Sequence, residues 1–218
     1  MATQQKMNQS NYSDKAFVFG NGTSRLTVHP PSFLDLGTVY GCNAQYREYS
    51  PHYLIAVDPK MVNEIIESGY HLKNSVWTNP NRGIKTKKNI NFFSPHKGWS
   101  SGPTALHFAA SNGHKEIFIF GFDYQGLKGK LNNVYANTFN YKKSTDSATF
   151  FGNWLNQTEK TIKEFRNIKF VRVIPDGGFV PDRLGPTVKN LRHITFAELA
   201  EQFPNTIYSN QIDQKTTI

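Results

Sequence analysis

The chain has 218 residues, of which 38% are hydrophobic and 14% aromatic, enough to form the core of one medium-sized domain. No apolar run approaches the roughly 20 residues of a membrane-spanning helix, and the polar residues 1–14 lack the apolar segment of a secretion signal. Cys42 is the only cysteine, which excludes an intramolecular disulfide and a cysteine-based zinc site. The composition therefore predicts a cytoplasmic protein without a membrane span.

The formal net charge of +9 makes anionic partners such as nucleotides, nucleic acid or acidic glycans plausible. A solubilising surface charge explains the same excess equally well. The candidates for holding an anionic acceptor, either a glycan or DNA, are the basic segment 82–88 and Lys97, Lys128, Lys130, Lys142 and Lys143.

Short apolar runs that end at Gly, Asn or Asp predict buried strands, and segments of helical spacing predict the helices between them. In chain order, the predicted elements are strand 16–19, helix 32–36, strands 38–42 and 53–57, helix 61–68, strands 75–78 and 90–93, helix 101–113, strand 116–120, helix 150–165, strand 169–174 and helix 195–202. Ser101 is the predicted N-cap of its helix, and Thr195 with Glu198 a predicted capping box.

Residues 125–149 show neither periodicity nor a compact apolar run, and loops this long within a domain are usually functional or disordered. We interpret this segment as a lid over a binding site. Residues 1–14 are predicted to be a disordered lead-in, residues 15–204 a single domain, and residues 205–218 a loosely held tail.

Strands that alternate with helices predict an α/β fold, here a Rossmann-like three-layer domain with a mostly parallel sheet and a long lid-like loop. In such sheets ligands bind beyond the carboxyl ends of the strands. Four predicted strands end in glycine or polar residues, at 20–25, Asn43, Asp58 and 121–124. This convergence predicts a site for a nucleotide or another phosphate-bearing ligand.

The segment after the first predicted strand is the best candidate for a phosphate site. It consists of Gly20, Asn21, Gly22, Thr23, Ser24 and Arg25. Glycines let backbone N–H groups approach an anion, and two hydroxyls and a guanidinium could bind it as well. The segment is neither a Walker loop nor a dinucleotide fingerprint, because it lacks Gly-Lys-Ser/Thr and has Arg25 at the third glycine position. A plain tight turn is the competing interpretation.

The start of the predicted helix 101–113 is a second candidate. Backbone donors at Ser101, Gly102 and Thr104, together with the positive end of the helix dipole, would attract an anion. An ordinary helix cap accounts for the same residues.

Three titratable residues are candidates for catalysis. Asp58 and Asp123 each follow a strand, where they could bind ribose hydroxyls or a metal ion, serve as a base, or simply cap a helix. Two carboxylates are too few to argue for a metal centre, and the histidines show no ligand spacing. His96 is the histidine expected nearest the site, because it precedes Ser101 by only a few residues.

Three blocks of the sequence resemble bacterial sialyltransferases of the Campylobacter type and the related MptE-like proteins. Residues 20–24 resemble their Gly-x-Gly-Pro-Ser loop, with Thr23 in place of proline, and residues 41–43 resemble their second-strand segment ending in asparagine. Residues 101–124 carry the most specific resemblance, to a Ser-Gly helix, a Gly-Tyr-Lys-Glu-Ile strand and a Gly-x-Asp end. The resemblance covers the first two thirds of the chain. The short length and the bias toward Asn, Lys and Phe also resemble phage-encoded relatives of these families.

This resemblance implies contacts to a cytidine nucleotide or its sugar. The residues that would make them are Gly20, Asn21, Gly22, Asn43, Ser101, Gly102 and Asp123. Lid tyrosines contact the leaving phosphate in the sialyltransferases, which makes Tyr124 and Tyr135 candidates here.

The family's catalytic base is a histidine after the lid tyrosines, and no histidine occurs here between His114 and His193. Asp58, Asp123 or His96 would then have to serve as the base, or the chemistry differs.

Three functions follow. The first is a glycosyltransferase that moves a sugar from a CMP-sugar-like donor to an acceptor hydroxyl, with no cofactor firmly implied. The second is an MptE-like pyrophosphokinase, which would use ATP and Mg²⁺. The third is a non-catalytic binding module associated with nucleic acid or phage. The oligomeric state is left open.

Overall fold

A computed structural model describes residues 14–81, 83–85 and 87–208. Within these ranges eight strands form one sheet in the order β5-β4-β3-β2-β1-β6-β7-β8, and every neighbouring pair is parallel. The strands are β1 (Lys15–Phe19), β2 (Thr38–Cys42), β3 (Tyr53–Ile55), β4 (Val76–Thr78), β5 (Asn91–Phe92), β6 (Glu116–Phe120), β7 (Lys169–Ile174) and β8 (Leu191–Thr195). The predicted α/β class with a Rossmann-like parallel sheet is confirmed.

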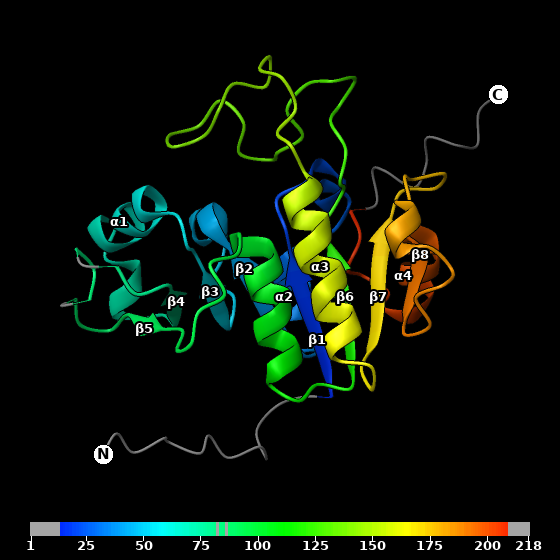
Figure 1. Cartoon of the computed structure of the whole chain (residues 1–218), viewed down its shortest axis with the longest axis horizontal. Helices are drawn as coiled ribbons and strands as arrows, with labels where there is room; N and C mark the ends of the chain where they lie inside the picture. The colour runs from blue at the N-terminus through cyan, green and yellow to red at the C-terminus, as the bar shows by residue number, and fades with distance from the viewer. Residues whose placement is uncertain (1–13, 82, 86, 209–218) are drawn as a thin grey trace.

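Helices and 3₁₀ turns cover both faces of the sheet and make three layers. The α-helices are α1 (Pro59–Glu67), α2 (Ser101–Ser111), α3 (Gly152–Glu164) and α4 (Phe196–Gln202). Figure 1 shows α2 and α3 side by side in front of the central strands, with α4 near the β7–β8 edge. The opposite face carries the 3₁₀ turns Thr23–Thr27 and Pro30–Phe33 and packs against α4.

The central strands are buried on both faces because their side chains alternate between two apolar clusters. Val18 of β1 and Ile119 of β6 pack with α2 on one face. Phe19 and Phe120 point to the other face, where their rings stack with centroids 4.6 Å apart and contact Phe33. The near-continuous apolar sequences of these strands follow from this double burial.

The strand order reverses at β1. The chain moves outward from β1 through β2, β3 and β4 to β5, and then returns to place β6 on the other side of β1. The connections after β1 and after β6 therefore diverge, which leaves a crevice between the carboxyl ends of these two strands. Open α/β sheets bind their ligands at such switch points.

Several details differ from the prediction. Strand β8 was not predicted, because Leu191–Thr195 alternates only weakly and directly precedes α4. The predicted helix 32–36 is instead the 3₁₀ turn Pro30–Phe33. Helix α2 begins at Ser101, so its N-cap is Ser100 and the prediction of Ser101 as the cap was wrong. The predicted capping box of α4 is confirmed, since both the Thr195 and the Glu198 hydrogen bonds are present.

The described part of the predicted tail, residues 205–208, is hydrogen-bonded to the segment that follows β1. Thr206 is buried, and its carbonyl oxygen accepts a hydrogen bond from the His29 backbone nitrogen at 2.9 Å. The Tyr208 nitrogen donates to the Thr27 oxygen at 3.1 Å. Residues 1–13 of the predicted lead-in and residues 209–218 of the predicted tail lie outside the described residues.

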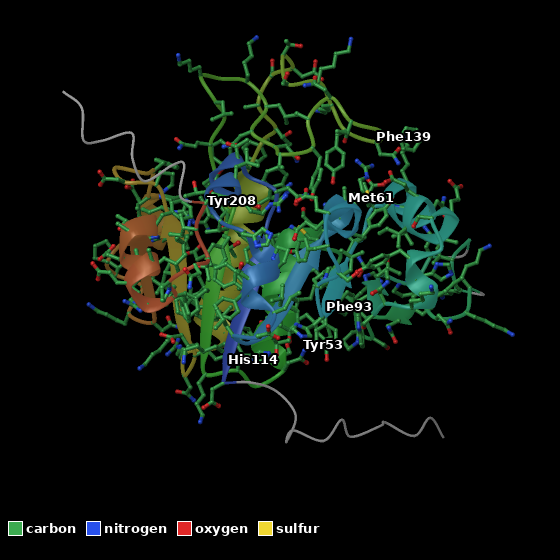
Figure 2. All side chains as sticks on the ribbon, turned by 180° about the vertical axis from the view of Figure 1, so that it is seen from behind. Tyr53, Met61, Phe93, His114, Phe139 and Tyr208 are labelled. Carbon is green, nitrogen blue, oxygen red and sulfur yellow. The ribbon has the colours of Figure 1, made fainter. Side chains whose placement is uncertain are left out.

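The lid, residues 125–149, contains no helix or strand but is held by isolated bridges between Leu127 and Lys130 and between Lys130 and Ser147. It stands above the carboxyl ends of the central strands (Figure 1). Asn140 of the lid donates to Glu64 of α1 at 2.7 Å, and Phe139 lies at the outer end of the lid (Figure 2). Among the described helices, none is long and apolar enough to cross a membrane.

Candidate functional site

A pocket lies at the switch point, between the loops that follow β1 and β6 and beneath the lid. Its cavity volume is about 150 Å³, whereas one water requires roughly 10–15 Å³, so it has room for a small organic group. The residues that line it are Gly20, Asn21, Gly22, Cys42, Asn43, Ser100, Ser101, Gly102, Pro103, Gly121, Phe122, Asp123, Tyr124, Gln125, Gly126, Leu131, Asn132, Asn133, Ala148, Thr149, Phe151 and Trp154.

The two glycine-rich loops form the floor of the pocket by packing on each other. The Gly20 nitrogen donates to Phe120 O at 2.7 Å, and the Gly22 nitrogen donates to Gly121 O at 2.9 Å. A Cβ at Gly20 would lie 2.6 Å from Gly121 O, which is closer than real Cβ contacts. The glycines of the first loop are therefore required by contact between two strand ends, whatever they also offer a ligand.

The first turn of α2 contributes backbone donors. Ser100 makes no side-chain cap, and the N–H groups of a first helical turn have no intrahelical acceptor. The Ser101 hydroxyl accepts a hydrogen bond from the Val57 nitrogen at 3.1 Å, which fixes the start of α2 against the end of β3. Gly102 lies against the Phe122 ring, where a Cβ would be 3.3 Å from Cζ. The positive end of the α2 dipole thus meets the pocket.

Among the described residues that line the pocket, Asp123 is the only charged one. Its carboxylate accepts hydrogen bonds from the Ser24 backbone nitrogen at 3.2 Å, from the Ser24 hydroxyl, and from the Asn132 side-chain amide at 3.0 Å. A carboxylate has about four lone-pair sites, so roughly one is left for a further donor.

Strand β2 delivers Asn43 to the pocket in a left-handed backbone conformation, φ 56°. Its Oδ1 atom is buried without a hydrogen-bond partner among the described residues. Buried polar atoms in native proteins are nearly always paired, so this oxygen lacks the partner that such an atom normally has. The neighbouring Cys42 thiol donates to Phe19 O at 3.3 Å, and burial raises its pKa to about 12.

The two candidate tyrosines occupy different places. Tyr124 lines the pocket, adopts φ 54°, and donates its hydroxyl hydrogen to Thr158 at 2.7 Å. Burial raises its pKa, although the Thr158 hydrogen bond and the charge of Arg172 oppose the shift. Tyr135 does not line the pocket; its hydroxyl accepts a hydrogen bond from Arg25 at 3.1 Å.

Arg25, predicted to hold an anion, does not reach the pocket. Its side chain is 2% exposed and pairs with both carboxylate oxygens of Glu48 at 3.2 Å. Its guanidinium also lies over the Tyr135 ring, 5.5 Å from the centroid. In the structure Arg25 anchors the lid from below through Tyr135.

The structure therefore brings together Gly20, Asn21, Gly22, Asn43, Ser101, Gly102, Asp123 and Tyr124. Thr23 and Ser24 do not line the pocket, but they hydrogen-bond to Asn132 and Asp123, which do. Thr104 makes the ordinary intrahelical bond to Ser100 O at 2.9 Å. Asp58 is exposed and caps α1 by accepting from the Lys60 nitrogen at 2.8 Å, and His96 is exposed outside the pocket.

Sequence reasoning missed the aromatic half of the pocket and the lid amide that borders it. Phe122, Phe151 and Trp154 line one side, and Asn132 lines the rim. The helical spacing of Phe151 and Trp154 predicts core positions, and spacing alone does not show that a side chain also lines a pocket. No signal in the sequence alone distinguishes Asn132 from the other asparagines of the lid.

The basic residues gather away from the pocket lining. Lys128, Lys130, Lys142 and Lys143 are exposed on the lid, and Lys97 pairs with Glu164 at 3.2 Å. Arg82 of the predicted basic segment lies outside the described residues. His114 lies at the end of the sheet opposite the lid (Figure 2). Within the described ranges, no three His, Cys, Asp or Glu side chains are grouped to hold a metal ion.

Fold and site together define a Rossmann-like α/β protein with a ligand pocket at its switch point. No family model matches the chain, and the search of curated proteins gave no match. Among solved structures, the chain is similar to the sialyltransferase CstII from Campylobacter jejuni in complex with the substrate analogue cytidine-5'-monophosphate, with 18% sequence identity and a TM-score of 0.49. The alignment covers 74% of this chain and 80% of that one.

Proposed function

We propose that the pocket binds a nucleotide-activated sugar of the CMP-sugar type, and that the protein transfers the sugar to an acceptor hydroxyl. The observation that carries the proposal is the pocket at the β1–β6 switch point, which is lined by the start of α2 and by Asn43, whose side-chain oxygen is buried without a partner among the described residues. Backbone donors at a helix N-terminus bind phosphate, and a buried amide oxygen binds a hydroxyl or amine.

The charge of the pocket favours a donor with one phosphate. No Lys, Arg or His is among the described residues that line it, and Asp123 supplies one negative charge. Diphosphates are usually held by cationic side chains or by Mg²⁺. A helix N-terminus supplies the equivalent of about half a positive charge, which suits a single phosphoryl group.

The aromatic side of the pocket suits a flat or apolar ligand face. Phe122, Phe151 and Trp154 line the pocket together with Leu131 of the lid, and the Phe122 ring packs against Gly20. Any nucleobase can stack on an aromatic ring, because every base has a flat π-face. A nucleoside monophosphate would therefore place its phosphate at the donors of α2 and its base or sugar on the rings.

Asp123 is the residue we assign to a substrate hydroxyl, because its carboxylate lines the pocket and retains about one acceptor site. A carboxylate in this position can orient a donor hydroxyl or act as the base for the acceptor. Asp58 and His96 lie outside the pocket, so the proposal gives them no role.

No observation favours the pyrophosphokinase, because Asp58 caps α1 and does not line the pocket with Asp123.

The binding module is a second candidate that one observation favours. Four exposed lysines lie on a lid segment, residues 125–145, that contains no acidic residue.

The test is a turnover assay that measures nucleotide released from CMP-, UDP- and GDP-activated sugars, each with and without a chelator. We expect release from the CMP-sugar, and a decrease of at least about tenfold in Asp123→Asn, equivalent to one lost charged hydrogen bond. The matched control is Asp146→Asn, a lid carboxylate that binds the Lys143 nitrogen and does not line the pocket. Absence of turnover together with steeply salt-dependent DNA binding would favour the binding module.

A further inference from the structure

One lid side chain, Asn132, uses its whole hydrogen-bonding capacity to join three segments. Its Oδ1 atom accepts from the Thr23 backbone nitrogen at 2.8 Å and from the Thr23 hydroxyl at 2.7 Å. Its Nδ2 atom donates to Asp123 Oδ2 and to Gln125 O, both at 3.0 Å. A side-chain amide has two donors and an oxygen with two lone pairs, so none of its capacity is left for a ligand.

These bonds link the lid to both sides of the switch point. Thr23 belongs to the loop after β1, and Asp123 to the loop after β6. The lid has other anchors, including the Val134 nitrogen on Asn21 O at 2.8 Å and the Tyr141 hydroxyl near the Ala44 nitrogen at 3.4 Å. Neither of those anchors reaches Asp123, and among the described residues Asn132 is the only lid side chain that hydrogen-bonds to the carboxylate.

We infer that Asn132 is a positioning residue that sets the Asp123 carboxylate for its ligand when the lid rests on the sheet. When the lid lifts, Oδ2 of Asp123 loses the Asn132 donor and keeps only the Ser24 backbone donor at 3.2 Å. The carboxylate is then held only from the side of Ser24, whose hydroxyl bonds Oδ1 and whose nitrogen bonds Oδ2, and it has lost the donor that fixes it from the side of the lid. Ligand binding and lid closure are therefore coupled through one amide, and this coupling rests on the proposed function because it needs a ligand that contacts Asp123.

The experiment uses Asn132→Asp, which keeps the shape of the side chain, replaces the donor by an oxygen, and sets a second carboxylate against Asp123. Asn137→Asp is the matched control, because Asn137 also lies in the lid and, among the described residues, its hydrogen bonds are to Ser144 and Lys142. Lid opening is measured by hydrogen exchange of the Val134 amide, which tracks the population of the open form. CMP affinity is measured by calorimetry.

We expect Asn132→Asp to accelerate Val134 exchange and to weaken CMP binding about tenfold each, while the melting temperature changes little. Asn137→Asp should change neither quantity. The double variant Asn132→Asp with Asp123→Asn removes the repulsion between two carboxylates but leaves an oxygen opposite Gln125 O, so it should recover part of the protection of Val134.

Equal effects of the two single variants, or failure of the double variant to restore protection, would overturn the inference. If Asn132→Asp does not fold, Asn132→Ala takes its place in the same comparison with Asn137→Ala. If the wild-type protein binds no CMP, the proposed function fails, and the exchange measurements still decide whether Asn132 pairs with Asp123 in the closed lid.

Discussion

The backbone nitrogen of Gly22 donates a 2.9 Å hydrogen bond to the carbonyl oxygen of Gly121, which ties the ends of β1 and β6 together beneath the pocket. The bond crosses the point at which the strand order reverses. Both walls of the site are therefore held at the closest approach that two backbones allow, and a side chain at either glycine would separate them.

Gly22→Ala tests this close approach. Its Cβ would lie 2.7 Å from Gly121 O and closer still to the Asp123 carboxylate, so one loop must shift. We expect a loss of about 1–3 kcal/mol in the free energy of unfolding, typical of overpacking, together with weaker nucleotide binding. Gly83→Ala is the control, because among the described residues the atom nearest to its Cβ would be Asn81 Oδ1 at 3.8 Å. Urea denaturation of both variants measures the difference, and equal stabilities would contradict the packing argument.

The sequence predicted the glycine loops and the strand ends because those signals are local. Apolar runs such as 116–120 mark buried strands, and Gly or Asp directly after them marks their ends. The order of the strands in the sheet is not encoded by any local pattern. The contact of Gly22 with Gly121 and Asp123 was therefore expected only because ligands bind where the carboxyl ends of parallel strands converge. The separation of Arg25 from the pocket was not predictable, because its partner Glu48 is set by tertiary structure.

The contacts of the lid are also beyond what local sequence patterns predict. The lack of periodicity predicts a lid over residues 125–149, but no local pattern indicates that Asn132 contacts Asp123. The spacing of Phe151 and Trp154 predicts a buried helical stripe, and both side chains pack against the core while they also line the pocket. A residue at the top of a helix can satisfy that spacing and still line a cavity.

Arg25→Met tests whether this arginine is structural. The change removes two hydrogen bonds to Glu48 and one to the Tyr135 hydroxyl while keeping the buried chain. Because Glu48 is partly exposed and can hydrate, we expect a loss of about 1–3 kcal/mol rather than the full cost of an orphaned buried charge. Arg192→Met, at an exposed pair 3.9 Å from Glu116, should change stability by less than about 0.5 kcal/mol.

If Arg25 instead bound the phosphate, Arg25→Met would abolish CMP binding while leaving stability unchanged. Unfolding and calorimetry on the same variant separate the two roles.

His193 makes stability depend on pH. Burial lowers its pKa below the ordinary 6.5, the charge of Arg172 lowers it further, and the hydrogen bond to Leu184 O opposes the shift. Because the folded protein binds this proton less well than the unfolded chain, the contribution is complete above about pH 6.5 and is lost as pH falls. His52 and His107 act in the same direction.

We expect His193→Gln, which can still donate to Leu184 O, to flatten the decrease in the free energy of unfolding between pH 7.5 and about 5.5. His96→Gln, at an exposed histidine, should leave that slope unchanged. Denaturant titrations across this range measure both, and identical slopes for His193→Gln and the wild type would contradict the assignment.

Cys42 should be unreactive in the folded protein although it lies beside the pocket. Burial raises its pKa to about 12 from an ordinary value near 9, so the thiolate fraction at pH 8 falls about a thousandfold. We expect the rate of reaction with a disulfide reagent to be lower by about 10²–10³ in native protein than in urea. A native rate close to the denatured rate would show that the pocket admits solvent to the thiol.

The most direct test of the account is a calorimetric titration of CMP into the wild-type protein and into Asn43→Gly, with CDP and ATP as competitors. Asn43→Gly removes the unpartnered amide while glycine tolerates the left-handed backbone at this position. The account predicts saturable binding of CMP without Mg²⁺, weaker binding of CDP and ATP, and a loss of about tenfold or more in the variant. Binding of ATP in preference to CMP, or equal affinity of both proteins for CMP, would contradict a monophosphate site at the β1–β6 switch point.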